Sequence, residues 1–417
     1  MKTDILANNV KIHYHPTSKF KDITIAFRFM NSLETINRPS RYYLAQLLSD
    51  TCKKYPTKDA VTRVLDENFG ANFKSSGDTV GNTDLLEFRC TMLNGQYVNQ
   101  DLLSKQIELI YDFIYDPNFI NNSFTETAYE EIQERLLLMV RSYNDQPSNY
   151  AYNQARIAFG EQLKIKALPS IQEIEECTLE DVNKAYFDMI KNDSLEIFVL
   201  GEFDQDKIEK CIKEKFNFTD RVFNTAIVQT CTRNDFIEII DRKPIHQSRV
   251  VFIYQTNQTI QNDDYDAILV GNGLFGGLPT SFLFQEVREK HSLCYTISSR
   301  YDGYDGIMVM QTAIDGQNYA RVKELVDQQF KRIVDGDFDE QHLETTKKMY
   351  INTLRSSLDA QKSIIAYDYR VSLLGPKRSV EETINHIKTV TKEEIIQAFK
   401  KIECKLHYCL TQEETHD

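Results

Sequence analysis

Residues Thr178–Ile190 read TLEDVNKAYFDMI, and a similar segment, TKEEIIQAFKKI, begins 213 residues later at Thr391. We interpret both segments as helices. Each precedes a strand-like run, which is Leu195–Leu200 (LEIFVL) in the first case and Leu406–Leu410 (LHYCL) in the second. The same order of elements at two places in the chain indicates an internal repeat.

The repeat extends through most of the chain. Further segments match in the same order and at nearly the same offset. The strand-like run Ile23–Phe29 (ITIAFRF) matches Arg249–Tyr254 (RVVFIY), and the helix around Tyr42–Cys52 that follows it matches Tyr265–Leu274. After these, Leu65–Phe73 (LDENFGANF) matches Val287–Tyr295 (VREKHSLCY). We therefore predict two similar domains, residues 1–218 and 236–417. The predicted connection is Phe218–Phe236, which contains polar breakers and shows no sustained period.

Within each half, the hydrophobic pattern alternates between helix and strand periods. In Phe124–Tyr143, apolar residues recur at helical spacing, and Met139 lies in the middle of this stripe, which predicts that it is part of a core. Asp84–Met92 (DLLEFRCTM) alternates as a strand does. The expected fold class is α+β, with two similar domains that each have a largely antiparallel sheet and helices packed on it.

The composition excludes several classes of protein. The 417 residues include 62 acidic and 49 basic residues, a net charge of −13, which argues against a nucleic-acid binder. No apolar run is long enough to span a bilayer, and charges interrupt the first 16 residues before a secretory segment can form. The eight cysteines form no C-x-x-C pair. We expect a cytoplasmic protein with reduced thiols and neither a membrane nor a nucleic-acid partner.

Neither a nucleotide motif nor a metal motif is complete. Gly271–Gly276 matches G-x-G-x-x-G, but the residues before it look helical and no acid follows at the required distance, so we interpret it as a tight turn between helices. No two histidines are four residues apart, so H-E-x-x-H and H-x-x-E-H helices are absent. We expect no cofactor and no metal on this chain.

Three segments together resemble the insulinase/pitrilysin family, the inverted zincins that include mitochondrial processing peptidase. Tyr43–Asp50 (YLAQLLSD) is similar to the family's zinc helix, and Phe124–Pro147 is similar to the helix that carries its third zinc ligand. Gly276–Ser299 (GGLPTSFLFQEVREKHSLCYTISS) is similar to a glycine-rich loop and helix in the family's C-terminal half. The chain resembles in particular the zinc-motif-lacking proteins of Gram-positive bacteria. The resemblance implies two similar α+β domains.

The zinc-site positions differ from the family pattern. Gln46 stands where the family has its first His, Ser49 at the position of the Glu base, Asp50 at the second His and Met139 at the ligand Glu. Amide, hydroxyl and thioether groups do not make a zinc hydrolase site. At helical spacing, Gln46, Ser49 and Asp50 lie opposite three leucines of the same segment, so we expect a solvated polar face without a metal.

Arg288 and Tyr295 match the family's Arg and Tyr that contact the substrate near the scissile bond. A guanidinium and a phenol can both donate hydrogen bonds to the oxyanion of a tetrahedral intermediate or to nearby peptide carbonyls. The structural alternative is that Arg288 stabilises a helix end and that Tyr295 fills a core.

The resemblance implies a divided enzyme. We expect this chain to be the non-zinc subunit of a heterodimer, inactive alone, which binds the peptide on a sheet edge and donates Arg288 and Tyr295. A homologous H-x-x-E-H partner would carry the zinc and the Glu base. The alternative from another class is a non-proteolytic scaffold or a peptide-binding homodimer of the same fold.

Overall fold

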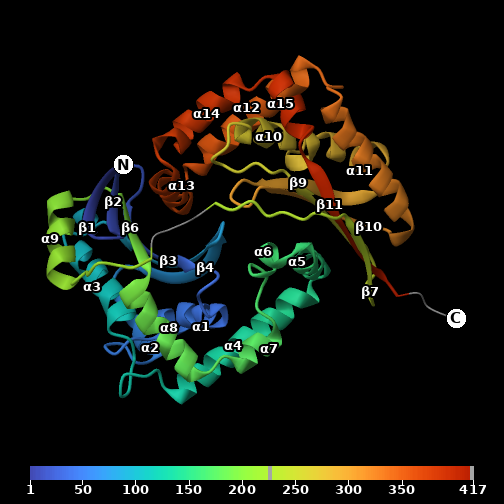
Figure 1. Ribbon diagram of the computed structural model, residues 1–417. Helices are drawn as coiled ribbons and strands as arrows, with labels where there is room; N and C mark the ends of the chain where they lie inside the picture. Colours follow the sequence, from blue (N-terminus) through green and yellow to red (C-terminus); the bar gives the residue numbers. More distant parts are fainter. Residues whose placement is uncertain (224–227, 414–417) are drawn as a thin grey trace. The chain divides into compact units, whose positions relative to one another are not determined.

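The chain divides into two compact units. One consists of Met1–Arg141 with Pro169–Ala226, and the other of Ser142–Leu168 with Ile227–Asp417 (Figure 1). The computed structural model describes residues 1–223 and 228–413. Residues 224–227 of the predicted connection Phe218–Phe236 therefore lie outside the described residues.

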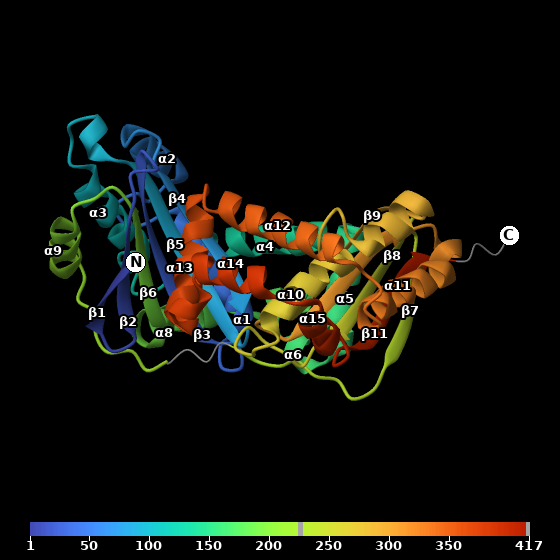
Figure 2. The ribbon, with the colours of Figure 1, turned by 90° about the horizontal axis from the view of Figure 1, so that it is seen from above.

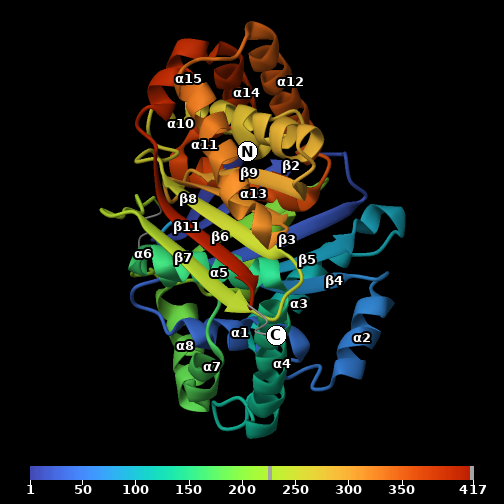
Figure 3. The same cartoon turned by 90° about the vertical axis from the view of Figure 1, so that its right-hand side faces the viewer.

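Each unit is built on one β-sheet. The first sheet, visible strand by strand in Figure 2, contains β1 (Lys2–Ala7), β2 (Val10–Pro16), β3 (Asp22–Ser32), β4 (Asn72–Val80), β5 (Thr83–Leu93) and β6 (Ser194–Gly201). The second contains β7 (Ile237–Lys243), β8 (Ser248–Gln255), β9 (Cys294–Asp302), β10 (Ile307–Ile314) and β11 (Glu403–Gln412), and Figure 3 shows β7, β11 and β8 side by side.

The two sheets have the same topology. Their orders are β1-β2-β6-β3-β5-β4 and β7-β11-β8-β10-β9. In both, one parallel pair (β2 with β6, β7 with β11) is followed by antiparallel pairs only. This match confirms the predicted fold class and the repeat. The first sheet differs in one respect, because β1 covers the edge of β2 and no described strand covers the equivalent edge of β7.

Helices cover the faces of both sheets. In the first unit these are α1 (Arg38–Asp50), α2 (Lys58–Glu67), α3 (Leu102–Tyr115), α4 (Glu126–Asp145, whose last turn belongs to the second unit), α7 (Ile171–Glu176), α8 (Leu179–Asn192) and α9 (Gln205–Lys215). In the second unit they are α5 (Pro147–Phe159), α6 (Glu161–Lys164), α10 (Tyr265–Asn272), α11 (Tyr319–Val334), α12 (Glu340–Ser357), α13 (Gln361–Leu374), α14 (Val380–Thr389) and α15 (Lys392–Phe399). Among the described residues, no helix is both long enough and apolar enough to cross a membrane.

The two segments that reveal the repeat begin with the same local structure. The side chain of Thr178 accepts a hydrogen bond from the N–H of Asp181, and the Asp181 carboxylate accepts one from the N–H of Thr178. Thr391 and Glu394 form the same reciprocal pair at the start of α15. Because such a capping box satisfies two helix-terminal N–H groups, it fixes where each helix begins.

Residues 142–168 pack with the second unit, although the predicted boundary places them in the first domain. On α5, Ala155 and Phe159 are fully buried against Val251, Ile253 and other residues of the second sheet. The helical period shows which side of α5 is apolar but does not show which sheet covers that side. The second sheet therefore lies between α5 and the helices α10, α11, α12, α14 and α15.

Gly271–Gly276 is not the tight turn that we expected. Gly271 lies in α10, and the chain continues directly into a π-helical turn at Gly273–Gly277. A Cβ atom on Gly271 would lie 2.2 Å from the ring of Phe399, and one on Gly273 would lie 2.4 Å from the ring of Tyr350. The glycines allow α10 to approach its neighbouring helices closely, so helix packing explains them.

His407 makes the second unit sensitive to acid. It is buried on β11, stacked on Phe252 with 3.6 Å between ring centroids, and burial lowers its pKa from 6.5 to about 4. The unfolded chain therefore binds a proton between pH 6.5 and 4 that the folded chain does not, and stability falls as the pH drops through this window.

His407→Phe should be more stable than the wild type by about 2 kcal/mol near pH 5 in urea unfolding, and nearly equal in stability above about pH 7. The matched control is His246→Gln, which changes an exposed histidine of the same unit.

Candidate functional site

The three degenerate zinc positions of α1 lie on one side of the helix, where Ser75 of β4 donates a hydrogen bond to Ser49. Asn37 starts the helix by accepting a hydrogen bond from the N–H of Ser40, and the opposite side of α1 is buried. Gln46, Ser49 and Asp50 are half-buried, so this polar face is less solvated than we expected. Ser49 donates to a carbonyl oxygen of its own helix, and Gln46 Oε1 is buried and has no hydrogen-bond partner among the described residues.

Asp50 binds a cationic side chain of α4. Both of its carboxylate oxygens accept hydrogen bonds from Arg135, at 3.2 and 2.6 Å. Lys58 Nζ lies 3.7 Å from the same carboxylate and also forms an ion pair with Glu131, which bonds Arg135 at 3.1 Å. The hydrogen bond from Lys58 lowers the pKa of Glu131. Two cations thus neutralise the two carboxylates of this site.

Met139 is not a core residue, in contrast to the sequence-based prediction. Its exposed fraction is 37%, whereas the buried stripe of α4 consists of Tyr129, Ile132, Leu136 and Val140. At 3.6 residues per turn, Met139 lies roughly 60° around the helix axis from Leu136 and roughly 100° from Val140, which places it at the margin of the stripe. The α4 side chain that does contact a zinc-position residue is Arg135. Sequence reasoning missed Arg135, because its partner Asp50 is 85 residues away.

The side chains at this site do not fit a catalytic zinc ion. Asp50 is the one carboxylate among the four degenerate positions, and Arg135 and Lys58 already lie against it. Zinc ligands are thiolates, imidazoles and carboxylates, and a guanidinium beside the site repels a divalent cation. Within residues 1–223 and 228–413, no group of three or more His, Cys, Asp or Glu side chains could hold a metal ion.

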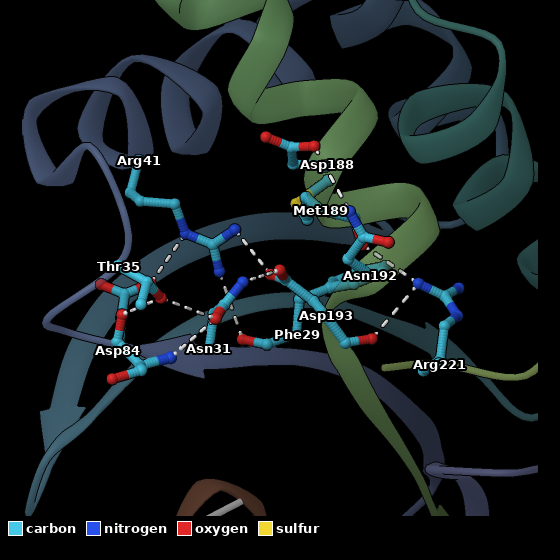
Figure 4. A network of polar contacts seen from close by, with 11 residues as sticks. Phe29, Asn31, Thr35, Arg41, Asp84, Asp188, Met189, Asn192, Asp193 and Arg221 are labelled. Carbon is cyan, nitrogen blue, oxygen red and sulfur yellow. Dashed lines mark hydrogen bonds and ion pairs between the residues drawn. The ribbon is translucent and has the colours of Figure 1, made fainter. Parts of the chain in front are cut away.

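A buried charge network fixes α1 to the sheet (Figure 4). Arg41 donates to Asp84 on β5 and to Asp193 after α8, both at 2.7 Å, and Asn31 donates to the second oxygen of Asp193 at 2.7 Å. Burial raises the pKa of Asp193 to about 6. A cavity of about 390 Å³ lies beside this network, lined by residues that include Thr35 and Asp188. The network holds the helix that carries the degenerate positions in one orientation.

Arg288 and Tyr295 lie next to each other in the second unit. Arg288 belongs to a π-helical segment, Phe284–Lys290, and its guanidinium carbon is 5.4 Å from the ring centre of Tyr295 and 4.4 Å from that of Phe284. Such cation–π contacts orient a guanidinium without using its N–H donors. Its carboxylate neighbour, Glu289, is 3.5 Å away and largely exposed. Arg288 therefore has donors available for a ligand.

Tyr295 does not fill a core. It is 80% exposed and lies near the start of β9, where Tyr295 and Thr296 together face the single residue Ala313 of β10 in a β-bulge. Bulges redirect side chains and are frequent next to binding sites. β9 is also a terminal strand of its sheet, so its outer edge presents backbone groups to which an extended peptide can bind. The site thus combines two side-chain donors with a sheet edge.

Comparisons with known proteins show what the whole chain is similar to. A family model described as the peptidase M16 inactive domain matches residues 176–350. The probable inactive metalloprotease YmfF of Bacillus subtilis is 25% identical over 405 residues, which cover 95% of each chain. The chain is thus similar along nearly its whole length to a probable inactive metalloprotease, and its residues 176–350 match the M16 inactive domain. The predicted resemblance is confirmed.

Two further relatives of this chain are informative. The crystal structure of a conserved protein from Enterococcus faecalis has a TM-score of 0.93 at 27% identity, with 100% of this chain and 99% of that chain covered. The uncharacterized zinc protease YmxG of Bacillus subtilis is 26% identical over 134 residues, 31% of this chain and 32% of its own. A zinc protease and a probable inactive homologue thus occur together in Bacillus subtilis.

Proposed function

We propose that this chain is the zinc-motif-lacking subunit of a two-subunit metallopeptidase. It binds the peptide substrate and supplies Arg288 and Tyr295 to a homologous partner that carries the zinc. The observation that carries the proposal is the contrast between the two sites: Arg135 and Lys58 neutralise Asp50 at the degenerate zinc position, whereas Arg288 and Tyr295 form an accessible donor pair.

The chemistry of peptide hydrolysis suits this division. The partner would hold the zinc, which would supply an activated water, and a Glu of the partner would serve as the base. Attack on the peptide carbonyl creates an oxyanion, and the guanidinium of Arg288 and the hydroxyl of Tyr295 donate hydrogen bonds to it or to neighbouring carbonyls. The peptide adds as a strand to the outer edge of β9, which places its main chain beside Tyr295.

A co-purified pair of subunits tests the donor roles. Arg288→Ala or Tyr295→Phe in this chain should lower the rate of peptide cleavage by the complex about 10²–10³-fold, the usual loss for one oxyanion donor. The matched control is Arg355→Ala, which removes an exposed arginine of α12, outside the proposed binding edge, and should leave the rate unchanged. The measurement is kcat/KM for a fluorogenic peptide with a partner that contains H-x-x-E-H.

Two results would contradict the proposal. A complex that cleaves at the full rate with Arg288→Ala would exclude the donor role. Chelator-sensitive cleavage by this chain alone would show that the chain binds catalytic zinc itself. If no zinc-bearing partner associates with the chain, the scaffold or peptide-binding alternative gains support. We place the protein in the cytoplasm, where its eight free cysteines would stay reduced.

A further inference from the structure

The outer edge of β7 is the unmatched feature of the repeat. In the first sheet, the equivalent strand β2 pairs with β6 on one side and with antiparallel β1 on the other. β7 pairs with β11, and among the described strands none lies on its other side. A free strand edge is a template for pairing with another chain. The same fold thus accepts an antiparallel strand at the corresponding place in its first unit.

The backbone groups of alternate β7 residues are directed outward. The carbonyl of Lys243 accepts a hydrogen bond from the N–H of Glu413 on the β11 side, so Lys243 is bonded inward. Because the direction alternates along a strand, Glu238, Ile240 and Arg242 direct their N–H and C=O groups away from β11. These three residues can therefore exchange hydrogen bonds with an added strand.

The same three residues are complementary to themselves in reverse order. If two β7 strands run antiparallel with Ile240 opposite Ile240, then Glu238 of each strand lies opposite Arg242 of the other. Opposite charges directly across a sheet stabilise the pair, whereas like charges destabilise it. Ile240 is 46% exposed although it is apolar, so the central pair would bury it. Shifting the strands by two residues sets Glu238 against Ile240 and loses both ion pairs.

We propose that β7 pairs antiparallel with β7 of a second copy of this chain and joins two second-unit sheets into one. The paired segment ends at Pro244, because proline has no N–H to donate to the added strand. In this register Pro244 lies opposite Phe236 of the other copy, which is half-exposed. Only two seven-residue strands would pair, whereas a stable specific interface buries roughly 1,200 Å² or more, so the dimer should be weak and concentration-dependent. The inference does not depend on the proposed function.

Sedimentation equilibrium of the full chain gives the first test. The wild type should show a reversible monomer–dimer equilibrium. Ile240→Lys sets two ammonium groups opposite each other at the centre and should raise the dimer dissociation constant at least about tenfold. The matched control, Ile5→Lys, makes the same change at an exposed isoleucine of β1, the terminal strand of the other sheet, and should have no effect.

Charge exchange tests the register. Glu238→Arg alone and Arg242→Glu alone each set like charges opposite each other and should weaken the dimer. The double variant Glu238→Arg with Arg242→Glu restores opposite charges in both places and should recover much of the dimer. Thermal melting of each variant monitors folding, since Glu238 also bonds Tyr319 and Lys323 within its own chain. A general loss of folding would not be repaired by the double variant.

Cross-linking provides an independent readout. In this register the two Cα atoms of residue 240 are about 5.5 Å apart, which allows a disulfide, so Ile240→Cys should yield a covalent dimer on mild oxidation. The Cα atoms of residue 242 are about 14 Å apart, so Arg242→Cys should not form this covalent dimer, although it retains the same eight native cysteines. A chain that stays monomeric throughout, or a dimer that tolerates Ile240→Lys, would overturn the proposal. Occupation of β7 by a zinc-bearing relative instead would also overturn it.

Discussion

Replacing Arg41 by methionine should lower the free energy of unfolding of the first unit by about 3–5 kcal/mol. Arg41 is 5% exposed, and its guanidinium bonds Asp84 and Asp193, which are equally buried. Methionine has a similar length but no charge, so two carboxylates would remain in the interior without a cation. Urea unfolding, followed by far-UV circular dichroism, measures the loss.

Two controls separate this charge effect from a general effect of substitution. Arg63→Met changes an exposed arginine of α2 and should alter stability by less than about 0.5 kcal/mol. Arg41→Lys keeps the charge, but a single ammonium group cannot reproduce the two directed bonds of a guanidinium, so it should lie between the wild type and Arg41→Met. A loss below about 1 kcal/mol in Arg41→Met would contradict the role of the network.

The pH dependence of the Arg41 effect has a defined sign. Burial raises the pKa of Asp193 from 3.8 to about 6, so the folded chain takes up a proton before the unfolded chain as the pH falls through this window. This group therefore adds stability as the pH falls from about 6 to 4. Without Arg41 the pKa of Asp193 rises further, and protonation relieves more of the penalty. The loss in Arg41→Met should be smaller at about pH 5 than at about pH 8.

Most of the fold was predictable because the matching elements recur in one order. The segments quoted for the repeat became β3 and β8, α8 and α15, and β6 and β11. The terminal strands β1 and β7 escaped prediction, since each is short and mixes charged with apolar residues. The placement of residues 142–168 was not predictable either, because α5 has an apolar side that either sheet could cover.

The site was predictable where its parts are close in the chain. Arg288 and Tyr295 are seven residues apart, and the structure places their side chains together. Arg135 was missed because its contact with Asp50 depends on how α1 and α4 pack, which no local pattern encodes. Met139 was assigned to the core for a related reason: periodicity locates the centre of an apolar stripe better than its margins.

Replacing Lys166 by methionine should detach the α5–α6 segment from the second sheet more easily. Lys166 forms an ion pair with Asp305 in the turn between β9 and β10, and both residues are buried. Burial raises the pKa of Asp305, which shows that its charge is costly in this environment. Without the lysine, Asp305 is left uncompensated, and the loss should be about 3–5 kcal/mol in urea unfolding. Hydrogen exchange should show the earliest loss of protection in α5 and α6.

The matched variants decide whether charge or packing causes this loss. Lys164→Met changes a neighbouring exposed lysine, whose partner Glu161 is also exposed, and should cost less than about 0.5 kcal/mol. Lys166→Met combined with Asp305→Leu removes both charges and leaves an apolar pair, which should recover most of the stability. If the double variant is as unstable as Lys166→Met alone, the lysine acts through packing of its side chain and not through the ion pair. Recovery would identify Lys166–Asp305 as the electrostatic contact that complements the apolar packing of α5.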